Sequence, residues 1–180
     1  MSGLPRFEPR FDLNRVRELA ERFLEENGDD KSVERIGLRG ISRGWINKEE
    51  LMKFVQWKAG GRNNHHADKN SPEFVREVSQ VAFKTSSEQL RIETLTLLDG
   101  VSWPTASTIL HFAFPGLYPI LDFRALWSLK AEQPNQYTFP FWDLYTRGCR
   151  QFATIARVDM RTLDRALWQY SSDHQGVRTS

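Results

Sequence analysis

The sequence contains a single cysteine, Cys149, among its 180 residues. One thiol can form neither an internal disulfide nor an all-cysteine zinc site, and a four-cysteine iron–sulfur cluster is excluded as well. A chain that uses no disulfides suits a reducing compartment. We therefore expect a cytoplasmic protein, associated with the nucleoid if the source is bacterial.

Long apolar runs and a strong charge of one sign are also lacking. No apolar run approaches the ~18 residues that a membrane span needs, and residues 1–10 have no apolar stretch of the signal-peptide kind. We expect a soluble protein with no membrane partner. The 25 Lys and Arg against 23 Asp and Glu give a net charge of +2, which is compatible with nucleic acid but does not argue for it.

Aromatic residues, in contrast, are plentiful. The 12 Phe and 6 Trp can build a core, and the length lies within the roughly 100–200 residues of one domain. We therefore expect one compact domain over residues 1–180 that is monomeric.

The hydrophobic residues follow a helical period nearly throughout, and no alternation predicts a strand. Start signals support this interpretation: Asp12 is a predicted N-cap, Asn47 with Glu50 makes a capping-box pattern, and Ser71 precedes a proline. The sequence predicts an all-α domain. The expected helices cover about 13–27, 47–58, 72–82, 86–98, 104–113, 123–129, 141–156 and 159–170, with none assigned over 29–46.

Residues 62–70 are polar without a period and follow Gly60-Gly61, so we expect a loop, the most mobile segment of the chain. The adjacent His65 and His66, with Asp68, lack the spacing of a metal-ligand set. We assign no metal to them.

A tight turn at residues 99–102 separates a helix that ends near Leu98 from one that has Pro104 in its first turn. The start of such a helix presents unpaired N–H groups, and its dipole favours a phosphate there. We expect the backbone amides of Gly100, Val101 and Ser102 to contact the DNA backbone. Gly100 has no Cβ to keep a phosphate away. An ordinary helical hairpin is the alternative.

Hydroxyl groups follow directly after this turn. Thr105 and Ser107 are expected to add side-chain contacts to phosphates. Such contacts position a protein on a duplex without reading its sequence.

Four short motifs in order resemble the helix–hairpin–helix (HhH-GPD) DNA glycosylase superfamily. They are Leu98-Asp99-Gly100-Val101-Ser102, Thr105-Ala106, Ile109-Leu110 and Tyr118-Pro119-Ile120-Leu121-Asp122. Over these residues the chain is most similar to the monofunctional, adenine-specific branch. The resemblance covers about residues 95–129, with the hairpin at about 95–113 and the start of the aspartate helix at about 118–129. It implies two helical lobes with a cleft between them, and double-stranded DNA as the partner.

The resemblance makes Asp122 the catalytic carboxylate. Loss of a base leaves an oxocarbenium-like sugar, which a fixed carboxylate stabilises, and the same group can orient or deprotonate the attacking water. The alternative is that Asp122 only caps its helix, which is worth about 1 kcal/mol. We expect a DNA N-glycosylase of base excision repair that removes a damaged, mispaired or modified base.

The motif also departs from the family in three places. Bifunctional members carry a lysine where this chain has Pro104, so we expect a monofunctional hydrolase without lyase activity. Ser102 replaces a glycine, and Asp99 replaces a proline and places a negative charge beside the expected phosphate. These two departures motivate an alternative function, a non-catalytic helix–hairpin–helix DNA-binding module. The weak net charge keeps a third interpretation open, a helical interaction domain without nucleic acid.

The family hairpin often holds a monovalent cation on backbone carbonyls. The resemblance assigns them here to Thr96, Leu98 and Val101. The resemblance implies a member without an iron–sulfur cluster, because the members that carry a cluster need four cysteines and this chain has one.

Five further residues are candidates for contacts with a base or with DNA, each with a structural alternative. Trp57, Lys58 and Arg62 could engage a flipped base and the backbone, or else form a core tryptophan with two solvated cations. Trp103 could pack on a sugar or attach the hairpin to the domain. Arg124 could reach a phosphate or form a structural ion pair.

Overall fold

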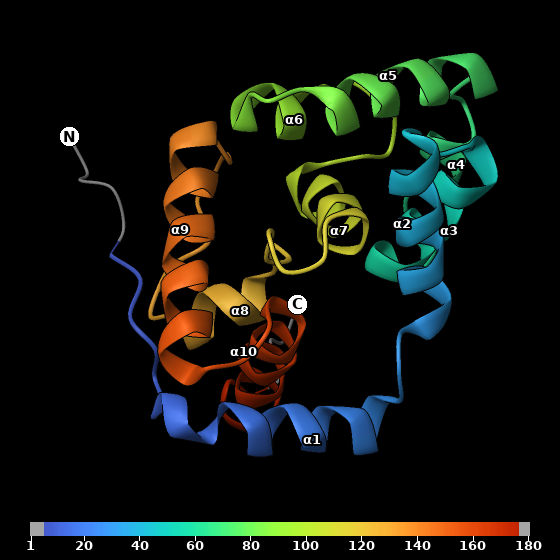
Figure 1. Ribbon diagram of the computed structural model, residues 1–180. Helices are drawn as coiled ribbons and strands as arrows, with labels where there is room; N and C mark the ends of the chain where they lie inside the picture. Colours follow the sequence, from blue (N-terminus) through green and yellow to red (C-terminus); the bar gives the residue numbers. More distant parts are fainter. Residues whose placement is uncertain (1–5, 177–180) are drawn as a thin grey trace. The chain divides into compact units, whose positions relative to one another are not determined.

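The computed structural model describes residues 6–176, and this part of the chain consists of helices, turns and extended segments without a β-strand. The all-α prediction is confirmed for these residues (Figure 1). None of the described helices combines the length and the apolar character needed to cross a membrane. The elements are η1 (Leu13–Arg15), α1 (Val16–Asn27), α2 (Lys31–Arg43), α3 (Lys48–Ala59), α4 (Asn64–Ala67), α5 (Pro72–Lys84), α6 (Glu88–Leu95), α7 (Trp103–Ala113), α8 (Phe123–Ser128), α9 (Phe139–Ala156) and α10 (Met160–His174).

The chain divides into two compact units. The first combines the residues up to Asp29 with those from Gly116 onward, and the second consists of residues 30–115. The predicted hairpin therefore belongs to the second unit and Asp122 to the first.

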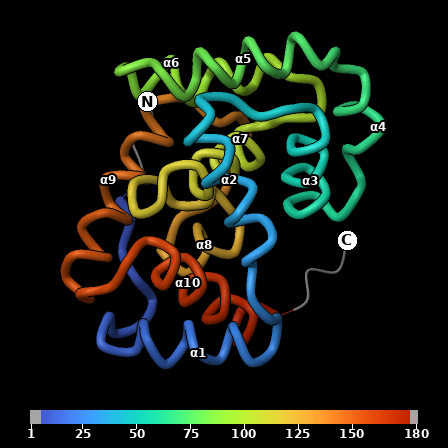
Figure 2. The backbone as a smooth tube through the Cα atoms, turned by 45° about the vertical axis from the view of Figure 1, so that its right-hand side comes forward, coloured from blue at the N-terminus to red at the C-terminus, as the bar shows by residue number. Residues whose placement is uncertain are grey.

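In the first unit, α1 packs along α10, and α10 also packs on α8 and α9 (Figures 1 and 2). The ring of Tyr118 stacks on that of the fully buried Trp142, with 5.6 Å between centroids. The N-terminal segment is tied to the end of α8, because the amide of Arg10 donates to the Ser128 carbonyl at 2.8 Å. These contacts fix the region from which Asp122 projects.

In the second unit, α2, α3 and α6 all pack against α7, which is buried from Thr105 to Ala113. The capping box at the start of α3 is confirmed: the Asn47 side chain accepts from the Glu50 amide, and the Glu50 side chain accepts from the Asn47 amide. Ser71 caps α5 in the same way, by accepting from the Phe74 amide.

Helix α2 lies in the segment to which the sequence pattern assigned no helix. Its glycines weaken any such prediction, since each costs about 1 kcal/mol relative to alanine. At Gly37 a Cβ would lie 2.2 Å from the Phe112 carbonyl oxygen, and at Gly40 one would lie 2.7 Å from the Ile46 side chain. Gly37 therefore lets α2 approach the backbone of α7, and Gly40 leaves room for the Ile46 side chain, advantages that only the tertiary structure shows.

Smaller corrections concern element ends and faces. Helix α6 begins at Glu88, two residues later than expected, and Ser87 caps it by accepting from the Leu90 amide. Phe74, Val81 and Leu90 belong to the apolar helical pattern of the sequence but are exposed in the structure. In α5 the buried side instead includes Ser79 and Phe83, so the apolar stripe is rotated from the predicted one.

Candidate functional site

The predicted helical hairpin is present between α6 and α7. Gly100 has a φ of +78°, and the Val101 amide donates to the Leu98 carbonyl at 3.1 Å, which closes the turn. Ser102 is the exposed N-cap residue of α7, with an extended backbone and no side-chain capping bond. The sequence therefore predicted the hairpin correctly, although α6 ends at Leu95, three residues before the expected end.

The reason for the glycine at position 100 differs from the expected one. A Cβ there would lie 2.8 Å from the Ala67 amide nitrogen and 3.0 Å from the Asn63 carbonyl oxygen. The space next to the Gly100 Cα is thus filled by the backbone around α4. The missing side chain serves this contact and does not open a path for a phosphate.

Asn70, which is 4% exposed, holds the turn from the other side. Its side-chain amide donates to the Asp99 carbonyl at 2.9 Å and to the Ala67 carbonyl at 2.8 Å, while its oxygen accepts from the Asp99 amide at 2.9 Å. The polar segment 62–70 is therefore a short helix with turns, anchored to the hairpin, and not the free loop that was expected. No sequence signal links Asn70 to a turn 29 residues away.

The phosphate donors predicted at the hairpin are only partly available. The Val101 amide is used within the turn, whereas the amides of Gly100 and Ser102 make no hydrogen bond among the described residues. Thr105 and Ser107 are buried, and the Ser107 hydroxyl donates to the Pro104 carbonyl at 2.8 Å. Contrary to expectation, neither hydroxyl is exposed at the surface, where it could contact a phosphate.

The carbonyls implied as cation ligands lie on this turn. The Leu98 oxygen already accepts the Val101 amide, and a carbonyl oxygen has a second lone pair that a cation could use. The cation at Thr96, Leu98 and Val101 stays a prediction. Elsewhere in residues 6–176, no group of three or more His, Cys, Asp or Glu could hold a metal ion.

Asp122 lies at the N-cap of α8 with its side chain partly exposed. Its Oδ1 accepts from the Arg124 amide at 2.8 Å, so the capping interaction is present. The four residues before it, 118–121, are buried, and the Tyr145 hydroxyl donates to the Ile120 carbonyl at 2.8 Å. The carboxylate is thus attached to a backbone that is fixed on both sides.

Two tyrosines share the electrostatic environment of Asp122. Burial, together with the negative charge of Asp122, raises the pKa of Tyr137 to about 12. Burial likewise raises the pKa of Tyr145 well above its usual value, and Asp122 adds to this shift. Both phenols therefore stay protonated near neutral pH. Tyr137 was not identified from the sequence, since it is 15 residues from Asp122 and part of no motif.

The remaining candidates mostly take structural partners. The Arg124 guanidinium lies 4.9 Å from the Trp168 ring centroid, a cation–π contact in place of the expected ion pair. Trp57 donates to the Asp30 carboxylate at 3.1 Å and meets Phe112 edge to face. These contacts support the core alternative for Trp57.

The other three candidates have less informative surroundings. Arg62 is exposed and donates from Nε to the Ala59 carbonyl at 3.2 Å. Lys58 and Trp103 are half-buried. Their expected contacts with a base or with DNA stay predictions.

Comparison of the chain with protein-family models, with curated proteins and with solved structures finds no match. The functional argument therefore depends on the residues themselves.

Proposed function

We propose that this protein binds double-stranded DNA and hydrolyses the N-glycosyl bond of a damaged, mispaired or modified base, with Asp122 as the catalytic carboxylate. The observation that carries the proposal is the state of Asp122. Its carboxylate is partly exposed, held by the Arg124 amide, and mounted on a buried segment that Tyr145 secures. A preorganised charge of this kind stabilises a developing cation at no cost of reorganisation.

The chemistry follows from the charge on the sugar. As the base leaves, the sugar acquires oxocarbenium character, and a carboxylate beside it lowers the barrier. The same group can orient or deprotonate the attacking water. Pro104 supplies no amine for a covalent adduct with the sugar, so the bond is cleaved by water alone.

The hairpin supports binding to the DNA backbone. Ser102 is the N-cap residue of an 11-residue helix, whose dipole favours a phosphate, and the Gly100 amide lies in the turn two residues before it. Within this proposal, Asp122 and the hairpin belong to a glycosylase-like fold that handles a flipped nucleotide.

A second candidate function is a DNA-binding module without catalysis. Two observations favour it: Asp122 makes the capping bond that a purely structural aspartate would make, and Asp99 is exposed in the turn. The experiment below separates the two functions.

The test compares affinity, at one salt concentration, for a duplex containing a cationic azasugar and for the same duplex with a neutral abasic analogue. The azasugar mimics the sugar cation, so the substrate base need not be known. We expect the wild type to prefer the azasugar strongly and Asp122→Asn to lose the preference. Asparagine is also a good N-cap, so thermal melts should change little.

Asp159→Asn is the matched control, because Asp159 caps α10 by accepting from the Thr162 amide at 2.7 Å. It should keep the azasugar preference. If the wild type binds both duplexes equally, the protein is a DNA-binding module without catalysis. If it binds neither duplex, DNA is not its ligand.

A further inference from the structure

Helix α2 carries a cation at every fourth position. Lys31, Arg35, Arg39 and Arg43 form what we call the α2 basic row. Residues four apart are neighbours on a helix surface, and each step advances about 6 Å along the axis. The row therefore spans about 18 Å.

The row lies away from the face by which α2 enters the core. The buried residues of α2 are Val33, Ile36, Gly37 and Gly40, and α2 packs with α7 (Figure 2). All four cations of the row are exposed. The sequence interpretation missed this surface because it assigned no helix here.

Few acids balance this row. Residues 31–62 contain eight Lys and Arg against three Asp and Glu, although the whole second unit has only twelve against ten. Arg35 makes no ion pair among the described residues, and its Nε donates to the Lys31 carbonyl at 3.2 Å. The positive charge of this unit is therefore concentrated on α2 and α3.

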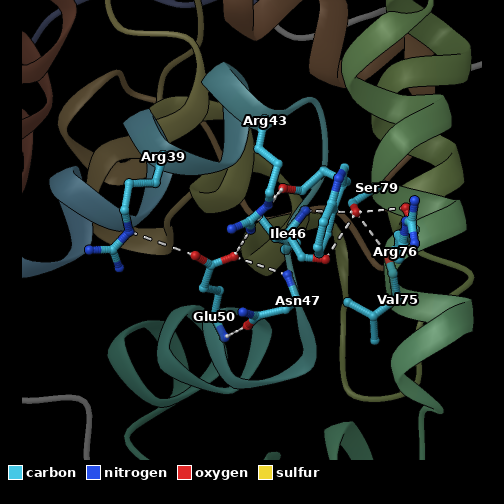
Figure 3. A network of polar contacts seen from close by, with 9 residues as sticks. Arg39, Arg43, Ile46, Asn47, Glu50, Val75, Arg76 and Ser79 are labelled. Carbon is cyan, nitrogen blue, oxygen red and sulfur yellow. Dashed lines mark hydrogen bonds and ion pairs between the residues drawn. The ribbon is translucent and has the colours of Figure 1, made fainter.

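A buried carboxylate orients the C-terminal end of the row (Figure 3). Glu50 pairs with Arg43, accepts from the Asn47 amide at 3.0 Å, and lies 3.8 Å from the Nε of Arg39. The Arg43 guanidinium also stacks 4.0 Å from the centroid of the Trp45 ring. Arg43 is thus fixed and largely neutralised, whereas the Arg39 side chain stays 62% exposed.

We infer that the α2 basic row binds the phosphate backbone of double-stranded DNA as a second surface beside the hairpin, an inference that rests on the proposed function. The row is inclined to the helix axis, and the exposed guanidinium groups of Arg35 and Arg39 at its centre can bind successive phosphates through charge-assisted, bidentate hydrogen bonds. A membrane surface fits less well, because an interfacial helix inserts its apolar face, and that face of α2 is buried.

Along α7, the contact with α2 and the hairpin are separated by less than one turn of duplex. Gly37 meets Phe112, which is ten residues from Ser102 along α7, or about 15 Å. One turn of duplex is about 34 Å long.

The experiment measures affinity for an undamaged duplex over a range of salt concentrations. In the plot of log K against log salt, the wild type should show a steep negative slope. Each phosphate contact contributes about 0.9 to this slope, so the double variant Arg35→Ala/Arg39→Ala should reduce its magnitude by nearly 2. Its azasugar preference should be unchanged, because these arginines neutralise phosphates and do not touch the sugar.

The matched control removes two exposed arginines from the first unit, Arg15→Ala/Arg147→Ala, which pair with Glu18 and Asp143. It changes the net charge equally but should keep the wild-type slope. Thermal melts establish that both variants are folded.

The outcomes distinguish the two proposals. If the wild type binds DNA and Arg35→Ala/Arg39→Ala keeps its slope, the α2 inference is wrong and the proposed function stands. A wild type that binds no duplex overturns both. If the wild type binds poly-glutamate more tightly than the duplex, the row belongs to an acidic protein partner instead.

Discussion

Gly100 combines two requirements that any side chain would violate. Its φ of +78° lies in the left-handed region, and the backbone of Ala67 and Asn63 occupies the position of a Cβ. The first requirement costs a non-glycine residue about 1 kcal/mol, and forced overpacking costs a further ~1–3 kcal/mol.

We therefore expect Gly100→Ala to lower the free energy of unfolding by at least about 2 kcal/mol, measured by urea denaturation. Gly60→Ala is the control within the same unit: its φ is +57° and no atom lies within 4 Å of the added Cβ. It should cost only about 1 kcal/mol. Equal losses for the two variants would show that the contact between the turn and α4 does not constrain position 100.

Residue-scale chemistry also distinguishes Asp122 from the other capping aspartates. Asp12, Asp122 and Asp159 all accept a backbone amide at the start of a helix or helical turn. Asp122 is the one that follows a buried extended segment and shares its surroundings with two neutral phenols. The family resemblance already singled out Asp122 in the sequence, but the two phenols beside it appear only in the structure.

At the scale of elements, Glu50 connects α2 to α3. Its carboxylate completes the capping box of α3 and pairs with Arg43 at the end of α2 (Figure 3). Removing one partner of a buried ion pair costs about 3–5 kcal/mol, and an exposed pair is worth ~0–1 kcal/mol. With Glu50 buried and Arg43 partly exposed, an intermediate value applies.

We expect Glu50→Ala to lower the free energy of unfolding by about 2 kcal/mol, measured by urea denaturation. Glu50→Gln should lose less, because its amide oxygen can still accept from the Asn47 amide. The neighbouring Glu49 is exposed, so Glu49→Ala should change stability by no more than about 0.5 kcal/mol. A loss as large for Glu49→Ala as for Glu50→Ala would exclude the link between α2 and α3.

The helices also differ in how well the sequence pattern predicts them. The helix starts at Asn47 and Ser71 were predicted correctly because each cap uses a contact three residues away. Helix α2 was missed because Gly37 and Gly40 lower its local propensity, and their benefit comes from contacts with distant residues.

At the scale of the whole molecule, the buried Cys149 thiol and Tyr145 phenol make the folded state less stable at alkaline pH. Burial raises the pKa of the Cys149 thiol far above its usual value and has the same effect on Tyr145. In the unfolded chain these groups ionise near pH 8.5 and 10. Since the folded state retains their protons, unfolding releases protons at high pH, and stability falls as pH rises above those unfolded values.

We expect the free energy of unfolding to decline above about pH 8.5 by about 1.4 kcal/mol per pH unit from Cys149, with Tyr145 adding to the decline above about pH 10. Urea denaturation at several pH values between 7 and 11 measures this dependence. Cys149→Ala should remove the thiol's share of the slope between about pH 8.5 and 10. An unchanged slope in that variant would contradict the burial of the thiol.

The sequence by itself determined the all-helical class, most helix starts, the hairpin between α6 and α7, and the position of Asp122 at the start of α8. All of these depend on residues within a turn or two of one another, where periodicity and capping act. Only the tertiary structure decided that α2 is a helix with an outward basic row and that Gly100 faces α4. It also placed Asn70 against the hairpin and Tyr137 near Asp122. These features are stabilised by contacts between residues far apart in the chain, and a local sequence pattern does not reveal such contacts.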